Sequence, residues 1–280
     1  MMPWRTLLLV SLAMVAFAGN SLLARAALSM TVLDPASFTS LRLASGALVL
    51  CLIAYLRSPC RPGQGDGVSA LALFVYAAGF SFAYVSLPAG TGALILFGAV
   101  QATMISWGWW RGERLDRAQV LGLLMALAGL VILMRPGLSA PPLGGSLLMM
   151  AAGIAWGVYS LRGRGLGDPT RVTAGNFLRA TPLALGVSVL WAGAAAWDRW
   201  GVIYALVSGA LASGIGYALW YAVLPALRPT QAASVQLTVP VLAALGGILV
   251  LGEPLTLRFV VASLAILSGV WLVIRRKAGV

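Results

Sequence analysis

Uncharged polar and aromatic side chains are the residues of this chain best suited to bind a ligand, because no Asp, Glu or His lies at the centre of its long apolar stretches. A polar group in an apolar setting needs a hydrogen-bond partner, so it either faces a cavity or pairs with a neighbouring helix. For Asn20, Gln101 and Gln236 both interpretations stand. We expect eleven residues to line a binding cavity: Asn20, Tyr76, Phe80, Tyr84, Gln101, Trp156, Tyr159, Ser213, Tyr217, Tyr221 and Gln236.

Two aromatic series stand out among these residues. Tyr76, Phe80 and Tyr84 are four residues apart and therefore share one helix face, and Tyr217 and Tyr221 repeat the spacing. Tyr84 and Tyr221 lie near the ends of apolar stretches, where aromatic side chains also anchor helices at a membrane interface. For the deeper pair, Phe80 and Tyr217, the cavity is the favoured location.

The composition excludes several kinds of chemistry. The chain has no His, no GxxxxGK[ST] phosphate loop and only two cysteines, Cys51 and Cys60. It therefore predicts no catalytic triad, no direct use of ATP, no metal site and no disulfide framework, and we expect neither enzymatic activity nor a cofactor. The missing carboxylates also argue against a proton-driven pump and favour uniport or exchange.

The positioning elements are predicted to be membrane-spanning helices. Apolar residues make up 60% of the chain and charged residues 9%, far below the roughly 25% of soluble domains. Uncharged stretches of about 20 residues recur throughout, which is the length of a membrane-spanning helix. The predicted spans are 6–27, 35–56, 68–87, 91–110, 117–134, 143–161, 171–197, 200–223, 230–251 and 255–274.

The net charge of +12 indicates how the chain is oriented in the membrane rather than nucleic-acid binding, because the arginines are scattered singly in short connections. Thirteen Lys and Arg residues fall on the side that holds the N-terminus and four on the other side, while Arg42 and Arg179 lie within spans. The positive-inside rule then places both termini in the cytoplasm. Arg42 and Arg179 are either functional, or structural through pairing with other groups or by reaching the nearer surface with their long side chains, and a structural role is favoured.

The chain also contains an internal repeat. Phe80, Tyr84 and the Leu87-Pro88 pair return 137 residues later, and the Gly-Glu pair at 112 returns at 252. Because each half holds five spans, the second half enters the membrane from the opposite side. We therefore predict an all-α membrane protein of two inverted five-helix repeats, 1–137 and 138–280. Inverted repeats permit alternating access, although channels use them too.

The N-terminal segment has a second interpretation, as a signal peptide with a cleavage site after Ala18. The repeat argues against it, because Phe17–Leu22 matches Trp156–Leu161 and cleavage would remove one partner. Pro240 in the ninth span interrupts a backbone hydrogen bond and predicts a hinge or a cavity wall.

The chain resembles the EamA type of the drug/metabolite transporter superfamily over essentially its whole length. The resemblance rests on Gly19-Asn20, on Asp34-Pro35 with Phe38 and Arg42, and on the two Gly-Glu pairs, Gly112-Glu113 and Gly252-Glu253. It departs from the pattern at Gln101, near which many relatives carry a second proline. The resemblance implies export of amino acids or other small metabolites across a bacterial inner membrane, and the aromatic faces are most similar to YddG-type exporters of aromatic and neutral amino acids.

The expected partners are an amino-acid substrate and membrane lipid, with no nucleic acid, in a monomer or homodimer. Two alternatives remain open at this point. One is export of hydrophobic drugs or sugar-like metabolites, and the other is a membrane scaffold or lipid-modifying enzyme that transports nothing.

Overall fold

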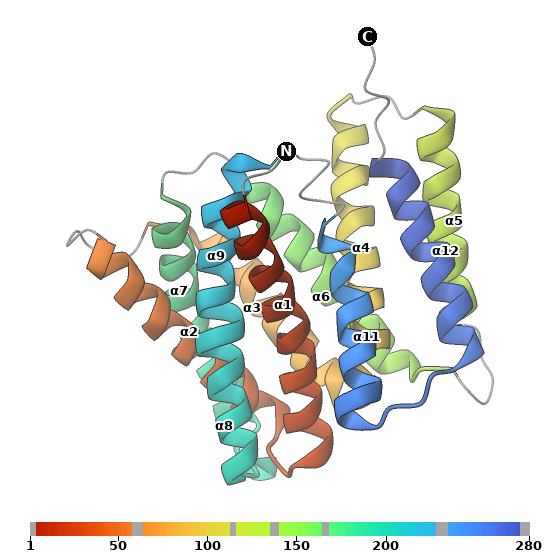
Figure 1. Cartoon of the computed structure of the whole chain (residues 1–280). Helices are drawn as coiled ribbons and strands as arrows, with labels where there is room; N and C mark the ends of the chain where they lie inside the picture. The colour runs from red at the N-terminus through yellow and green to blue at the C-terminus, as the bar shows by residue number, and fades with distance from the viewer. Residues whose placement is uncertain are drawn as a thin grey trace.

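A computed structural model describes residues 4–57, 64–112, 116–134, 140–163, 168–227 and 235–274, and every regular element in this part is helical (Figure 1). The first half contains α1 (Trp4–Met30), α2 (Pro35–Arg57), α3 (Gly67–Tyr84), α4 (Ala89–Trp110) and α5 (Arg117–Met134). The second half contains α6 (Leu143–Arg162), α7 (Pro169–Leu190), η1 (Ala192–Ala194), α8 (Arg199–Val207), η2 (Ser208–Ile215), α9 (Gly216–Val223), η3 (Leu224–Ala226), α11 (Thr238–Leu251) and α12 (Leu257–Ile274).

Most of the acidic residues serve as helix caps. The carboxylates of Asp34, Asp66, Asp168 and Asp198 each accept a hydrogen bond from a backbone N–H two or three residues further on. This satisfies a donor that the first turn of a helix leaves without a partner. Helix α11 ends at Gly252, whose φ of 67° is the left-handed conformation that glycine adopts without steric cost. Helices α2 and α7 each begin at a proline that directly follows a capping aspartate, Asp34 and Asp168.

The chain is a multi-pass membrane protein. Six of the described helices are long and apolar enough to cross a membrane: α1, α2, α3, α4, α6 and the continuous helix from Arg199 to Ala226. Three more apolar helices are shorter within the described residues. Helix α7 is long but less apolar than these, and it ends at Leu190 although the predicted span continues to residue 197. The count of ten spans and the cytoplasmic termini stay predictions.

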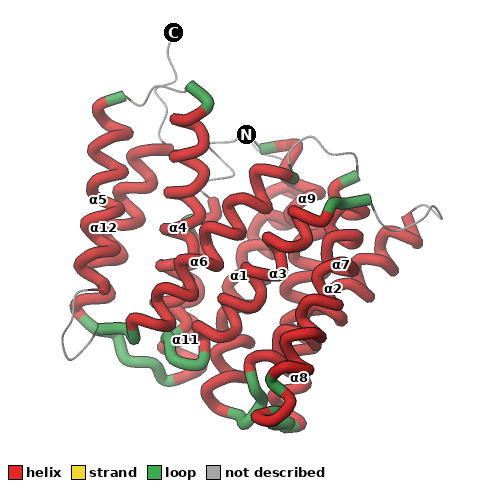
Figure 2. Tube along the Cα trace, turned by 180° about the vertical axis from the view of Figure 1, so that it is seen from behind, coloured by secondary structure: helices red, strands yellow, loops and turns green. Residues whose placement is uncertain are grey.

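The helices of the two halves pack mainly against each other. Helices α3 and α4 pack on α6, while α8, α9 and α11 pack on α1, and α2 packs on α7. Both views show α5 and α12 side by side at the edge of the bundle (Figures 1 and 2). The most extensive helix–helix contacts therefore join one half of the chain to the other. An inverted repeat would produce this reciprocity, and the division into repeats at residue 137 stays a prediction.

Glycines allow the closest of these approaches. A Cβ atom at Gly129 of α5 would lie 2.8 Å from the Ile266 side chain of α12. One at Gly209 of η2 would overlap the backbone of Arg42 and the hydroxyl of Ser45 in α2. Small residues of this kind bring helix backbones together in membranes, where the hydrophobic effect does not drive association. Gly209 therefore holds η2 directly against α2 at Arg42.

Candidate functional site

The candidate site is a small cavity enclosed by α1, α3, α4, α6 and α9, near the middle of the bundle. Its volume is about 20 Å³, which is room for roughly one water molecule. Five of the eleven predicted residues line it. The walls consist of Phe17, Asn20, Ser21, Tyr76, Phe80, Leu96, Phe97, Trp156 and Tyr217.

Trp156 joins the two predicted aromatic faces. Its ring centroid lies 4.9 Å from that of Tyr76 and 5.1 Å from that of Tyr217. Phe80 packs against Tyr76 at 5.5 Å, and Phe17 packs edge-on against Tyr217 at 5.7 Å. Such pairs stabilise each other beyond the apolar area they bury. The first-half and second-half aromatic side chains therefore form one continuous wall.

Asn20 lies in this wall and also joins helices. Its Oδ1 accepts a hydrogen bond of 2.6 Å from the Ser208 hydroxyl, and its Nδ2 lies 3.5 Å from the hydroxyl oxygen of Tyr76. The two interpretations left open by the sequence are thus compatible, because one amide can bridge α1, α3 and η2 while its side chain faces the cavity.

Arg42 is the polar residue behind the wall. Its side chain is buried, with 1% relative exposure, so it does not reach a surface. Nη2 donates to the Tyr76 hydroxyl at 2.9 Å and Nε to the Ser213 hydroxyl at 3.2 Å. The guanidinium carbon lies 4.6 Å from the ring centroid of Phe80. The prediction that the Arg42 side chain reaches the nearer surface is therefore wrong.

Arg179, the sequence counterpart of Arg42, has a different environment. It lies on an exposed face of α7, and its Nη1 donates to the Gly175 carbonyl of its own helix at 3.0 Å. The recurrence of arginine in both halves therefore does not give the two residues one role.

The π-helical segment η2 explains how Ser208 and Ser213 both reach the polar groups around Tyr76, which are Asn20 and Arg42. Ser208 and Ser213 are five residues apart, and in an α-helix they would point about 140° away from each other. A turn closed by i→i+5 hydrogen bonds instead places them on one side. The hydroxyl of Ser208 can then contact Asn20 while the hydroxyl of Ser213 contacts Arg42.

The other predicted residues lie outside the cavity wall. The Tyr84 hydroxyl donates to the Ala89 carbonyl at 3.2 Å, which fixes the connection between α3 and α4. Tyr159 stacks on Trp156 at 5.4 Å, and Tyr221 packs beside the end of α6. Gln236 is half-buried just before α11.

Gln101 faces a different space. It lines an apolar groove of about 470 Å³ between α4, α5, α6 and α12, and its Nε2 has no hydrogen-bond partner there. A groove with such walls suits hydrocarbon, whether from lipid or from an apolar compound. Gln101 is therefore separated from the central cavity.

The sequence did not identify several wall residues. Asn20 and Ser21 follow Phe17 by three and four residues, so the shared helix face of these residues was a usable signal. Leu96 and Phe97 gave no signal, because apolar residues fill every span. Ser208 could be placed only through the π-helical register.

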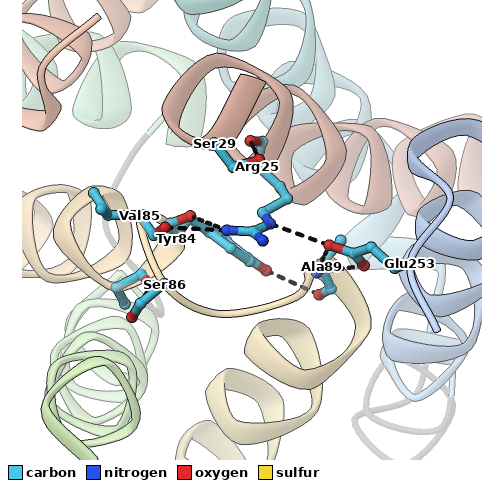
Figure 3. A network of polar contacts seen from close by, with 8 residues as sticks. Arg25, Ser29, Tyr84, Val85, Ser86, Ala89 and Glu253 are labelled. Atoms are coloured by element: carbon cyan, nitrogen blue, oxygen red, sulfur yellow. Dashed lines mark hydrogen bonds and ion pairs between the residues drawn. The ribbon is translucent and has the colours of Figure 1, made fainter. Parts of the chain in front are cut away.

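A polar network joins several helices at one end of the bundle (Figure 3). Arg25 of α1 pairs with Glu253 at 3.1 Å and donates to the Tyr84 and Val85 carbonyls at 3.1 Å each. Glu253, in the segment after α11, also accepts the backbone N–H of Ala89 at 2.8 Å. The network therefore ties α1, α3 and α4 to the end of α11. The repeat counterpart of Glu253, Glu113, lies outside the described residues.

A more exposed ion pair joins helices at the opposite end. Arg162 of α6 contacts Asp66, the cap of α3, at 2.9 Å. Hydrogen bonds from Ser69, and the charge of Arg162, lower the pKa of the Asp66 carboxyl to about 2. The two ends of the bundle are thus held by separate charged contacts.

Comparison with known proteins shows similarity to membrane transporters. Residues 143–275 match the EamA-like transporter family. An uncharacterized protein of Pseudomonas aeruginosa is 58% identical over 276 residues, 98% of this chain and 96% of its own. The threonine/homoserine exporter RhtA of Escherichia coli is 27% identical over 267 residues, 90% of this chain and 85% of its own. A crystal structure of a protein 21% identical has the same fold, with a TM-score of 0.68 over 97% of this chain and 98% of that one.

Proposed function

We propose that this chain, which matches the EamA-like transporter family over residues 143–275, exports neutral amino acids, aromatic ones among them, across the bacterial inner membrane. The observation that carries the proposal is the aromatic and neutral polar cavity shared by both halves. The similarity to the threonine/homoserine exporter supports a neutral amino acid as the cargo.

The cavity walls offer each part of such a substrate a suitable contact. The rings of Trp156, Tyr76 and Tyr217 present electron-rich faces, which attract an ammonium group without a carboxylate. Phe17 and Phe97 offer an apolar surface for the side chain. All seven acidic residues of the chain lie outside the described helices, so the ammonium group has no carboxylate partner within these spans.

The size of the cavity supports alternating access. A volume of about 20 Å³ cannot hold an amino acid, so the walls must separate to admit one. The walls come from both halves, and the two ends are held by Arg25–Glu253 and Arg162–Asp66. Opening one end while the other stays closed gives the transport cycle, and the absence of acidic residues from the helices supports uniport or exchange over proton coupling.

Counterflow in proteoliposomes tests the proposal. Liposomes loaded with unlabelled L-phenylalanine or L-threonine should accumulate the labelled amino acid when they contain the full chain. Trp156→Leu should lower the phenylalanine rate about tenfold, because it removes the ring between the two aromatic faces. Trp200→Leu is the matched control, since Trp200 is 58% exposed and remote from the cavity.

Two outcomes of the counterflow experiment would contradict the proposal. If no amino acid in a broad panel shows counterflow, the substrate class is wrong. If Trp156→Leu and Trp200→Leu have equal effects, the central cavity is not the binding site.

A second candidate, export of hydrophobic compounds, is favoured by the groove of about 470 Å³, which is within the range of drug-sized sites. Resistance of cells to toxic amino-acid analogues and to uncharged hydrophobic drugs separates the two candidates. Cationic dyes are disfavoured, because Arg42 is buried beside the central cavity and the helices that the structure describes carry no acidic residue.

A further inference from the structure

We propose that Arg42 binds the carboxylate of the transported substrate, an assignment that rests on the proposed amino-acid transport. The residue stands behind the aromatic wall of the cavity, and its guanidinium lacks the anionic partner that its position calls for.

Among the residues that the structure describes, the positive charge of Arg42 is uncompensated. Arginine stays protonated in proteins, and a buried charge without a counter-charge is strongly unfavourable in a membrane. The partners of Arg42 are the hydroxyls of Tyr76 and Ser213 and two ring faces, and it forms no ion pair with any carboxylate in the described part of the chain. These neutral contacts reduce the cost of burial, but they do not neutralise the charge.

One nitrogen of the Arg42 guanidinium, Nη1, has no hydrogen-bond partner. A guanidinium group has five N–H donors in a planar fork, which matches the two oxygens of a carboxylate. Nε and Nη2 of Arg42 are engaged, whereas the buried Nη1 has no hydrogen-bond partner. A carboxylate that contacts Nη1 would satisfy the free donor and the charge together.

The guanidinium of Arg42 lies directly behind two side chains that line the cavity. Tyr76 and Phe80 line the cavity on one side and contact Arg42 with their rings, at 5.1 and 4.6 Å from the guanidinium carbon. One layer of side chains therefore separates the guanidinium from the cavity. The walls must move to admit any amino acid, and a movement of α3 that shifts these two rings would uncover the guanidinium.

The different positions of Arg42 and Arg179 then determine the orientation of the bound substrate. Arg179 is exposed on α7, so the second half offers no equivalent anchor. The carboxylate is placed toward α2 and α3, and the ammonium group and side chain toward Trp156 and Tyr217.

The test compares each amino acid with its own carboxamide. Purified full chain is titrated with L-phenylalanine, L-threonine and their amides, and binding is measured by ligand-induced thermal stabilisation and by competition in counterflow. Wild type should prefer the acid over the amide by about 30-fold or more, the loss expected when a buried charge pair loses one partner. Arg42→Gln should abolish the preference, Arg42→Lys should keep part of it, and Arg179→Gln should leave it unchanged.

If Arg42 has only a structural role, the binding of acids and amides follows a different pattern. Arg42→Gln would then weaken acid and amide equally, and the preference of wild type would persist in the variant or be absent from the start. Any of these results overturns the assignment. The wild-type comparison needs no variant and holds even if Arg42→Gln does not fold. Failure of the proposed function is distinct, because wild type would then exchange no amino acid, and that result overturns both.

Discussion

Replacing Glu253 by Gln should open the end of the bundle that the Arg25–Glu253 network closes. The substitution keeps the shape of the side chain but removes its charge, and it leaves Arg25 without an anionic partner. Breaking a buried ion pair costs roughly 2–5 kcal/mol. The side chains of Arg25 and Glu253 retain 20% and 11% exposure, so the lower value of about 2 kcal/mol is appropriate, which is about 30-fold in an equilibrium constant.

This shift is large enough to detect. If the state open at this end is about 1% populated in wild type, a 30-fold change raises it to about one quarter. Spin labels at Ser29→Cys and Leu255→Cys, both exposed positions, report the separation of α1 from the segment after α11. The native Cys51 and Cys60 are first replaced by Ser. Double electron–electron resonance should show a new long-distance population in the Glu253→Gln protein.

The control breaks the other ion pair. Arg162→Gln removes the exposed contact at the opposite end and should not increase the long-distance population between these labels. An unchanged distance distribution in Glu253→Gln, or the same change in Arg162→Gln, would refute the view that the Arg25–Glu253 network holds this end closed.

Two further predictions concern stability. Gly209→Ala should lower the free energy of unfolding by roughly 1–3 kcal/mol, because its Cβ would overlap the backbone of Arg42; Gly186→Ala, with open space around it, should not, and equal thermal unfolding in detergent would contradict the close contact. Asp66 stabilises the fold mainly above its unfolded pKa of 3.8, and this contribution is lost as pH falls toward about 2. The difference in Tm between wild type and Asp66→Asn should therefore be positive at pH 7 and vanish near pH 2, and a constant difference would contradict it.

The helical architecture was predictable because membranes impose it. Runs of uncharged residues and Asp-Pro helix starts are local signals, and they located most of the described helices within a few residues. The end of α7 was less predictable, because apolar residues continue through Trp197 while Asp198 caps the next helix.

The site was predictable only in part. Helical spacing identified Tyr76, Phe80 and Tyr217 as facing inward, and all three line the cavity. The fate of the two arginines depends on tertiary contacts, since Arg42 meets Tyr76 and Ser213 whereas Arg179 meets its own helix. No residue pattern announced the π-helical register that brings Ser213 to Arg42.

The partnership between Arg42 and Ser213 also has a consequence for biosynthesis. The two residues are 171 positions apart in the chain, so at roughly 5–20 residues per second a ribosome needs about 10 to 30 s to supply the second after the first. During that interval the nascent first half already holds Arg42 within a helix, yet the segment that packs over it does not exist. During insertion, the charge of Arg42 therefore has to be accommodated without its Ser213 contact until η2 has been synthesised.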